Sequence, residues 1–443
     1  MLSRISFTIT FISVFAVESL SQPQCIVDKK LITAYINANS ESKEKTAKSL
    51  VKNNICFDSL YLTLKEGKNY STNVQKGFFE HNFINKIGIE HPYQVFIPYK
   101  YDPKKKYQVR LFLHGGVSSF DMRKVISLLN TSDTAWKSVN SICLFPSSWN
   151  LSKWWGYNQY ENLSELLHFI KSNYNINEND VYITGVSDGG SGIYYLSNFY
   201  QTPFSCFLPF IGGMRMLTVI PKKQFYIRNY QGTSFFIVDG RKDELFDIAT
   251  EISIVNELKK NAKEVTFFVV DSSKHSTNWY PVLKDTIKRF IASHKRNPFP
   301  DNVYYATEKP DTFNRKFWVI IDKIGKTKGE TLTDSNTVFL DNQKIALFPR
   351  NKPFGQIEVK KIGNEVQVKV QDVKRYTLLI SPDHFDLSKP IVVYTNNTLS
   401  FEGIIPKDIK TLLKYNAIDN DRTMLFASEI TIVVGKNNSK KQP

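Results

Sequence analysis

The spacing of apolar residues divides the chain into three regions. Residues 22–77 are rich in lysine, and their apolar residues recur at helical intervals, which predicts a small helical region. Between residues 78 and 297, short continuous apolar runs alternate with helical patterns, as expected for buried parallel strands joined by helices. From residue 298 onward the pattern changes to short strands. With 443 residues, the chain is long enough for two or three domains.

The last region, residues 298–443, predicts an all-β sandwich. Its expected strands lie at 317–321, 356–361, 365–370, 376–380, 391–394, 399–404 and 429–434, with one helix at 407–414. Strands of this number and spacing are typical of a sandwich, for which an immunoglobulin-like arrangement is one candidate. Arg296–Pro300 carries two prolines and predicts the linker that separates this sandwich from the preceding region.

A Gly-rich turn in the middle region is the first candidate for chemistry. Residues 185–189 read Gly-Val-Ser-Asp-Gly, between an apolar strand and an apolar helix. They fit Gly-x-Ser-x-Gly, in which a strained strand-to-helix turn exposes the serine, here Ser187. A structural turn and a phosphate-binding loop are the alternatives, but the glycine spacing fits neither of the common nucleotide-binding patterns.

Two further polar residues follow later apolar strands. Asp243 lies in the turn after the strand at 234–238, and His275 lies in the loop after the strand at 264–270. Ser187, Asp243 and His275 therefore occur in the order in which a hydrolase triad is found on a parallel sheet. Asp239 and Glu244 are the alternatives for the acid, because both lie close to Asp243 in the sequence.

A second Gly-rich segment follows the apolar strand at 107–113. It reads His-Gly-Gly-Val from His114 to Val117. Glycines in this place allow a backbone N–H to point at a developing oxyanion. We expect that N–H group to come from Gly116 or Val117 and a second one from Asp188, with His114 in a structural role.

Together these motifs give residues 78 to 297 a resemblance to the α/β-hydrolase family. Within it, the chain resembles secreted esterases related to dienelactone hydrolases, polyhydroxyalkanoate depolymerases and feruloyl or acetylxylan esterases. The resemblance rests on His-Gly-Gly at 114–116, the Ser187 pentapeptide, Asp-Gly-Arg-Lys-Asp at 239–243, and His275. Such enzymes often carry His-Gly before the acid, whereas this chain has Asp239-Gly240.

The resemblance implies an α/β fold, with a mostly parallel sheet flanked by helices, and a serine hydrolase activity. Ser187 would form an acyl intermediate on carboxylic esters, with His275 as the base, Asp243 as its partner, and no cofactor. Peptidases of the prolyl-oligopeptidase kind share the fold and the triad order, but no propeller precedes the hydrolase region here. A hydrolase-like binding protein without catalysis is the third reading.

Aromatic residues near the predicted site suggest how a substrate would be held. Trp154 and Trp155 lie in a loop dense in aromatics, and Trp279 follows His275. Stacking on sugar or aryl faces would use such side chains, and simple packing of the loops is an equal alternative. The expected substrate is a small-molecule or polysaccharide-linked ester, and the sequence names neither its acyl group nor its alcohol.

The N-terminus and the cysteines predict an exported protein, secreted or periplasmic. Residues 1–21 combine the basic Arg4 with an apolar run at 5–17 that is too short to span a bilayer, which is typical of a signal peptide. Cys25 and Cys56 flank the helical region, so a disulfide between them is expected in an oxidising compartment. No cysteine or histidine spacing predicts a metal site, and no later run of residues predicts a membrane span.

The chain is basic, with 58 Lys and Arg residues against 42 Asp and Glu residues and a net charge of +16. The lysines are spread along the chain, and no nucleic-acid-binding module is visible. We therefore expect no nucleic-acid partner. The charge predicts a solvated surface, with attraction to anionic polysaccharide or cell envelope as the alternative.

Overall fold

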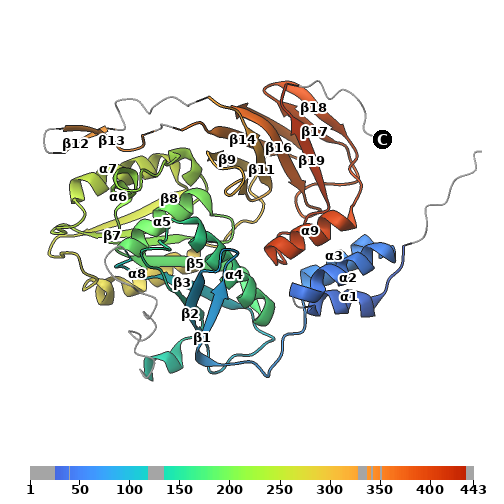
Figure 1. The fold of residues 1–443 in the computed structure, drawn as a ribbon, viewed down its shortest axis with the longest axis horizontal. Helices are drawn as coiled ribbons and strands as arrows, with labels where there is room; N and C mark the ends of the chain where they lie inside the picture. Colours follow the sequence, from blue (N-terminus) through green and yellow to red (C-terminus); the bar gives the residue numbers. More distant parts are fainter. Residues whose placement is uncertain are drawn as a thin grey trace, which may run out of the picture.

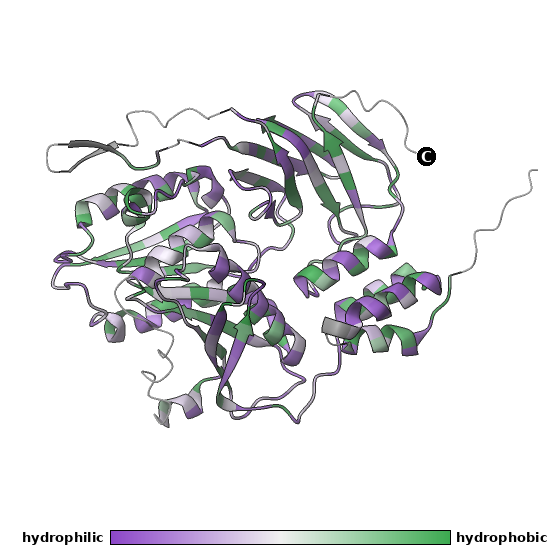
Figure 2. Ribbon diagram, viewed as in Figure 1, coloured by the Kyte–Doolittle hydropathy of each residue, from purple (hydrophilic) through white to green (hydrophobic). Residues whose placement is uncertain are grey.

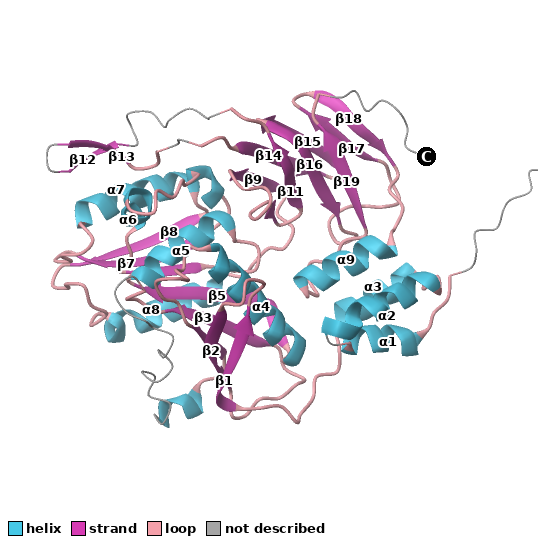
Figure 3. Cartoon of the chain, viewed as in Figure 1, coloured by secondary structure: helices cyan, strands magenta, loops and turns pink. Residues whose placement is uncertain are grey.

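The computed structural model describes residues 25–38, 40–117, 134–327, 337–340, 343–349 and 352–435 (Figure 1). The predicted signal peptide, residues 1–21, lies outside this part of the chain. Three helices at the N-terminus, a central α/β region and a C-terminal pair of sheets follow one another along the sequence (Figure 3). No helix in the described ranges combines the length and the apolarity that crossing a bilayer requires.

The central region is built on one eight-stranded sheet in the order β1-β2-β4-β3-β5-β6-β7-β8. Its first two strands are antiparallel neighbours at one edge, and β3 to β8 run parallel. This is the strand order of the α/β-hydrolase fold, so the predicted fold class is confirmed. The strands are β1 (Gly77–Ile84), β2 (Glu90–Ile97), β3 (Tyr107–Leu113), β4 (Ile142–Pro146), β5 (Ile176–Val186), β6 (Phe207–Phe210), β7 (Ser234–Gly240) and β8 (Glu264–Val270).

Helices cover both faces of this sheet, which explains why its strands read as continuous apolar runs. Along β7, Phe235 and Ile237 join one buried apolar cluster, whereas Phe236 and Val238 join another on the opposite face. The first cluster includes residues of α4, α5 and α7, and the second includes residues of α8. The helical segments are η2 (Thr134–Ser138), α4 (Tyr157–Asn173), α5 (Asp188–Phe199), α6 (Met214–Val219), η3 (Ile227–Tyr230), α7 (Ile248–Asn261) and α8 (Tyr280–Ser293).

The N-terminal helices pack against the C-terminal part of the chain. They are α1 (Lys29–Asn37), α2 (Ser40–Lys52) and α3 (Phe57–Glu66), and they carry hydrophobic and hydrophilic residues side by side (Figure 2). Their apolar residues, including Ile32 and Leu60, share one buried cluster with Leu412 and Leu413 of α9 (Ile409–Asp419). A disulfide joins Cys25 to Cys56 across this helical region.

The C-terminal region is a β-sandwich, as the strand pattern predicts. Its two sheets have the orders β10-β11-β16-β19 and β18-β17-β15-β14-β9, and side chains from both sheets form one buried apolar cluster. Outside them lie the paired strands β12 (Thr337–Leu340) and β13 (Gln343–Ala346). The sandwich strands are β9 (Asn302–Thr307), β10 (Arg315–Lys316), β11 (Val319–Ile324), β14 (Gly355–Ile362), β15 (Glu365–Gln371), β16 (Val373–Ile380), β17 (Ile391–Thr395), β18 (Thr398–Gly403) and β19 (Ser428–Val433).

The prediction of an immunoglobulin-like arrangement is wrong for this sandwich. Strand β14 pairs with β15 in a hairpin and with β9 on its other side, and β15 pairs in parallel with β17. In an immunoglobulin domain the two sheets contain strands in a different order, ABED and CFG. The expectation fails because an alternating pattern shows which face of a strand is buried but not which strand lies beside it.

The hydrophobic core continues across the predicted linker at 296–300. Tyr304, Ala306 and Phe313 belong to the same buried cluster as the core of the central sheet. Asn229 of η3 donates to the carbonyl oxygen of Ala306 at 2.9 Å and accepts from its backbone N–H at 2.7 Å. The central region and the sandwich thus share apolar surface that each would expose if it stood alone.

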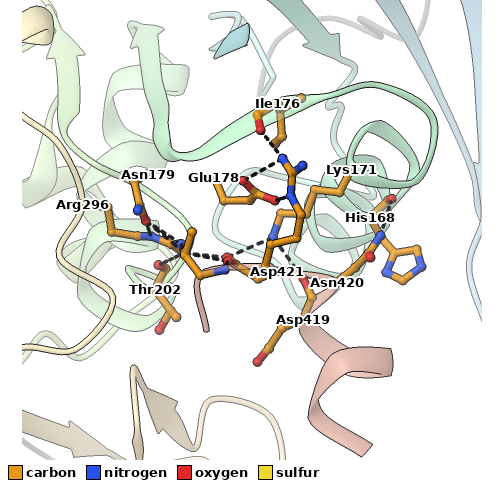
Figure 4. A network of polar contacts seen from close by, with 12 residues as sticks. His168, Lys171, Ile176, Glu178, Asn179, Thr202, Arg296, Asp419, Asn420 and Asp421 are labelled. Atoms are coloured by element: carbon orange, nitrogen blue, oxygen red, sulfur yellow. Dashed lines mark hydrogen bonds and ion pairs between the residues drawn. The ribbon is translucent and has the colours of Figure 1, made fainter. Parts of the chain in front are cut away.

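Buried charges also join the two regions (Figure 4). Arg296 pairs with Asp421 at 2.9 Å, and each side chain is 2% exposed. The ammonium of Lys171 lies 3.5 Å from the same carboxylate and donates to the carbonyl oxygen of Asp419 at 3.0 Å. Burial opposes the ionisation of Asp421, but Arg296 and Lys171 outweigh it and hold the pKa of that carboxyl well below its usual range.

We therefore predict that Asp421→Asn destabilises the whole chain. Removing one partner of a buried ion pair leaves an uncompensated buried cation, which costs about 3–5 kcal/mol. The free energy of unfolding, measured by urea denaturation, should fall by that order. Asp285→Asn is the matched control, because Asp285 and its partner Lys288 are both exposed. An equal effect of the two substitutions would contradict the role of the Asp421 cluster.

Candidate active site

The turn between β5 and α5 holds Ser187 in a strained conformation. Its φ is +57° and its ψ is −120°, which a residue with a side chain rarely adopts. A Cβ at Gly185 would lie 2.7 Å from the carbonyl atoms of Gly189, and one at Gly189 would overlap the backbone carbonyl of Leu113. Both glycines of the pentapeptide are therefore required by the close approach of three backbone segments.

The structure brings Ser187, His275 and Asp243 together in one hydrogen-bonded chain. The Ser187 Oγ lies 2.9 Å from His275 Nε2, and His275 Nδ1 lies 2.7 Å from Asp243 Oδ2. A carboxylate only accepts, so the ring proton sits on Nδ1, and Nε2 is left to accept the serine proton. This arrangement is the one by which a histidine activates a serine as a nucleophile.

Asp243 is held in place by the turn after β7. Its second oxygen accepts from the backbone N–H groups of Leu245 at 2.8 Å and Phe246 at 3.1 Å. The carboxylate is 2% exposed, and the His275 side chain is 22% exposed. The ring of Phe246 also packs edge-on to the imidazole at 5.5 Å, so the histidine has a fixed orientation and remains accessible.

The two alternative acids lie elsewhere. Asp239 is buried within the end of β7, and burial together with the nearby charge of Asp243 raises its pKa to about 8. Glu251 of α7 is buried close by, and burial and then Asp239 raise its pKa well above its ordinary value. Glu244 is exposed and pairs with Lys274 at 3.1 Å. Of Asp239, Asp243 and Glu244, only Asp243 hydrogen-bonds His275 in the described residues.

The predicted oxyanion segment runs beside the nucleophile. A Cβ on Gly115 would lie 2.9 Å from the Ser187 Cβ and 3.5 Å from its Oγ, so this backbone passes directly alongside the serine. Gly116 has a φ of +74°, and Val117 is fully buried. Asp188 begins α5, whose N-terminal N–H groups carry partial positive charge. The arrangement places both predicted donor segments next to Ser187.

His114 supports this segment. Burial lowers its pKa to about 4, so the ring is neutral near neutral pH. Its Nε2 accepts from the backbone N–H of Ser148 at 3.0 Å, and its Nδ1 donates to the carbonyl oxygen of Gly115 at 2.7 Å. Both ring nitrogens are occupied by the backbone, which fits the structural role expected for His114.

The three tryptophans predicted to contact substrate are buried instead. Trp154 is 0%, Trp155 4% and Trp279 5% exposed, and all three belong to apolar clusters of the core. The Trp154 indole N–H donates to the carbonyl oxygen of His114 at 2.8 Å, so this residue supports the oxyanion segment from behind. The substrate-wall expectation is wrong for them, because aromatic density in a loop does not distinguish a core contact from an exposed one.

Sequence reasoning missed the segment that follows β6. Gly212 approaches the backbone of Gly190 so closely that a Cβ would lie 2.6 Å from it, and a Cβ on Gly213 would overlap the ring of Phe246. The backbone N–H of Gly213 also donates to Ser191 Oγ at 2.9 Å. The adjacent Gly212-Gly213 pair after an apolar strand was the available signal. The Gly212-Gly213 segment thus packs against the turn that carries Ser187, as the segment at Gly115 also does.

No protein-family model matches the chain, and no curated protein matches it. Solved structures with partial likeness include a thermostable esterase (20% identity, 49% of this chain, 63% of the esterase, TM-score 0.40). A ferulic acid esterase from Anaeromyces mucronatus matches at 18% identity over 51% of this chain and 92% of its own, with a TM-score of 0.38. A protein described as a dipeptidyl aminopeptidase IV from Bacteroides ovatus matches at 14% identity, over 49% of this chain and 36% of its own, with a TM-score of 0.42.

The chain spans less than two thirds of the length of the thermostable esterase and of the aminopeptidase. The strand order, the register and the turn at Ser187 define the central region as an α/β-hydrolase fold independently of these matches.

The two neighbouring aspartates should differ sharply when changed. Asp243→Asn should slow the reaction of Ser187 with a fluorophosphonate probe by orders of magnitude, because an amide favours the wrong imidazole tautomer, an effect of about 10⁴ in a well-characterised serine protease. Asp239→Asn should change that rate by less than about tenfold, because an amide resembles the protonated carboxyl that burial favours there. The measurement is the second-order labelling rate of each variant, and a reversed ranking would assign the acid to Asp239.

Proposed function

We propose that this protein is a serine hydrolase that cleaves carboxylic esters through an acyl-Ser187 intermediate. The single observation that carries the proposal is the hydrogen-bonded chain from Ser187 through His275 to Asp243 on a strained turn. A protein that only binds ligands has no need of a nucleophile, a base and an oriented carboxylate in this order. The strain at Ser187 supports the same reading, because strained backbone gathers at sites of chemistry.

In the first half of the reaction, Ser187 Oγ attacks the carbonyl carbon of the ester. His275 Nε2 takes the serine proton, and the new imidazolium is stabilised by Asp243, to which its Nδ1–H is already donated. The carbonyl oxygen becomes an oxyanion, which the N–H of Asp188 and that of Gly116 or Val117 would receive. The tetrahedral intermediate then expels the alcohol, which leaves with the proton from His275 Nε2.

The second half repeats these steps with water. His275 Nε2 accepts a proton from a water molecule as that water attacks the acyl carbonyl, and the same donors receive the oxyanion. Collapse of the second intermediate releases the acid and returns the proton to Ser187. Asp243 stays ionised throughout, and its role is to hold the imidazole tautomer.

The substrate we propose is a small-molecule or polysaccharide-linked ester. Peptide bonds could be cleaved by the same chain of groups, and the peptidase reading is therefore the second candidate. A panel of activated esters graded by acyl length, with aryl and sugar esters included, separates the two when it is run beside aminoacyl and dipeptidyl anilides. Turnover of the anilides above that of every ester would favour the peptidase.

Ser187→Ala should abolish ester hydrolysis and fluorophosphonate labelling while leaving the fold intact. The change removes only the hydroxyl group and breaks no packing contact on which the sheet depends. Loss of a triad member leaves only the residual rate of about 10³–10⁴ over water that binding and the oxyanion donors supply. The measurements are turnover of an activated acetyl ester and circular dichroism. A variant that keeps more than a few per cent of the parent turnover would exclude Ser187 as the nucleophile.

We propose further that the protein is exported, either secreted or periplasmic, with residues 1–21 removed as a signal peptide. The disulfide between Cys25 and Cys56 supports this location, because such bonds persist in oxidising compartments. Cys143 of β4 and Cys206, the residue before β6, are buried free thiols.

The proposed export leads to a prediction about the N-terminus and the four cysteines. Protein recovered from its native compartment should begin near Gln22, and Cys25 and Cys56 should resist alkylation until a reductant is added. Intact-mass measurement and peptide mapping under non-reducing conditions test both points. Cys143 and Cys206 are the internal control, because they should become alkylated on unfolding without reduction. Free alkylation of Cys25 and Cys56 in the unfolded, unreduced protein would contradict the proposal.

A further inference from the structure

A cavity of about 980 Å³ lies where the three regions of the chain meet. Its walls come from α1 and α2, from the segment after α3, from the second half of α4, and from α9. The N-terminal helices contact α9 directly through the apolar cluster of Leu60 and Leu412, so the cavity is bordered by packed elements.

Two half-buried lysines in this cavity, Lys43 and Lys68, lack carboxylate partners within the described residues. The Lys43 ammonium lies 4.2 Å from the centre of the Tyr35 ring, and that of Lys68 lies 5.4 Å from the Tyr70 ring. Burial and then the charge of Lys68 lower the pKa of Lys43 to about 8, and burial lowers the pKa of Lys68. The folded chain thus holds two like charges close together in a partly desolvated place, which an anion between them would relieve.

Most of the remaining charges of the cavity are matched, and Lys52 and Lys410, which have no ion-pair partner in the described residues, are exposed to solvent. Lys414 pairs with Glu429 at 2.6 Å. On its floor, Lys171 pairs with Asp421, and Arg422 pairs with Glu178. At its rim Lys48 pairs with Glu44. Figure 4 shows part of the floor, where Asn420 of the α9 C-cap donates to the carbonyl oxygen of His168 at 3.5 Å. Asn420 also donates to Ser172 Oγ at 2.8 Å. The floor is therefore a fixed surface, and the half-buried cations of the cavity that lack a carboxylate partner in the described residues are Lys43 and Lys68.

Two other titratable groups face the cavity. Burial, then Lys171 and Lys43, lower the pKa of His168 to about 4, so it is neutral near neutral pH. Burial raises the pKa of Glu165. Neither group adds charge that would compensate Lys43 and Lys68 fully.

The rest of the lining is largely apolar. Ile36, Val51, Leu64, Phe169 and Leu413 contribute side chains to the walls. Such walls favour a ligand with an apolar body and disfavour a small, fully hydrated ion.

The cavity is remote from Ser187. It adjoins Asn173 and Arg422, and Arg422 donates to the carbonyl oxygen of Ile176, the first residue of β5. Ser187 lies beyond the other end of that strand. The neighbouring β3 runs from Tyr107, opposite Ile176, to Leu113, opposite Gly185, which spans about 20 Å.

We propose that this cavity binds an organic carboxylate with an apolar body, whose carboxylate lies between Lys43 and Lys68 and whose body lies against the aliphatic and aromatic walls. The site is separate from the nucleophile, so the inference does not depend on the proposed hydrolase function.

The test uses the full chain with 2-naphthoate as the probe and 2-naphthamide as its neutral counterpart. Isothermal titration near neutral pH should give saturable binding of 2-naphthoate. The neutral 2-naphthamide should bind at least about tenfold more weakly, because it cannot make the charge-assisted hydrogen bonds of the carboxylate. Labelling Ser187 beforehand with a fluorophosphonate should leave the affinity for 2-naphthoate unchanged. Competition between the label and the probe would assign the binding to the hydrolase site and overturn the proposal.

The matched variants are Lys43→Gln with Lys68→Gln, and Lys45→Gln with Lys76→Gln. Both pairs remove the same charge, but Lys45 and Lys76 are exposed and outside the cavity. The first pair should weaken binding by about tenfold or more, and the second by less than about twofold. The first double variant should also unfold at a urea concentration no lower than the parent, because it removes two half-buried charges that repel each other.

Three results would overturn the proposal. They are the absence of saturable 2-naphthoate binding up to about 1 mM, equal loss of affinity in the two double variants, and binding of inorganic phosphate as tight as that of 2-naphthoate. The last result would define a site for small anions without an apolar requirement.

Discussion

The left-handed turn at Ser187 is the constraint on which the central region depends. A non-glycine residue in such a conformation costs about 1–3 kcal/mol, and it persists only where the surroundings fix it. Here the Ser187 N–H donates to the carbonyl oxygen of Phe210 at 3.0 Å, and the carbonyl oxygen of Ser187 accepts the first bond of α5 from Ser191 at 2.9 Å. A Cβ at Gly185 or Gly189 would press on Leu113 of β3, and one at Gly190 would press on the carbonyl oxygen of Phe210 in β6.

The same parallel order explains why much of the site could be predicted from the sequence. Parallel strands bring their carboxyl ends to one edge, so polar residues that directly follow apolar runs meet there. Ser187, Asp243 and His275 each follow a separate run, and their hydrogen-bonded chain is what that rule leads one to expect. The structure, rather than the sequence, separates Asp239 from Asp243, because Asp239 is buried within the end of β7 and Asp243 hydrogen-bonds His275.

The sequence does not reveal how deeply a loop side chain is buried, nor which strands pair with one another. In the sequence, Trp154 and Trp155 resemble exposed binding residues, because the pattern of residues along a chain does not show what packs over a loop. Burial of Trp154 is decided by the approach of α5 at Gly192, where a Cβ would overlap its side chain. The pattern predicts seven of the sandwich strands and misses β9 and β10. The parallel pairing of β15 with β17 depends on a connection that alternation does not encode.

The carboxyl and amino ends of the parallel strands have different roles in this protein, and the difference follows from the direction of the strands. The carboxyl edge presents Ser187 on a turn and must stay accessible, so the regions added before and after the sheet have to dock elsewhere. They dock at the amino end, where Arg422 reaches Ile176 and Glu178 of β5, and Arg296 reaches Asn179. Buried charges suit this junction because their geometry is specific, and a displaced ion pair is penalised more heavily than a displaced apolar contact. The cavity between the docked helices and α9 lies at this same junction.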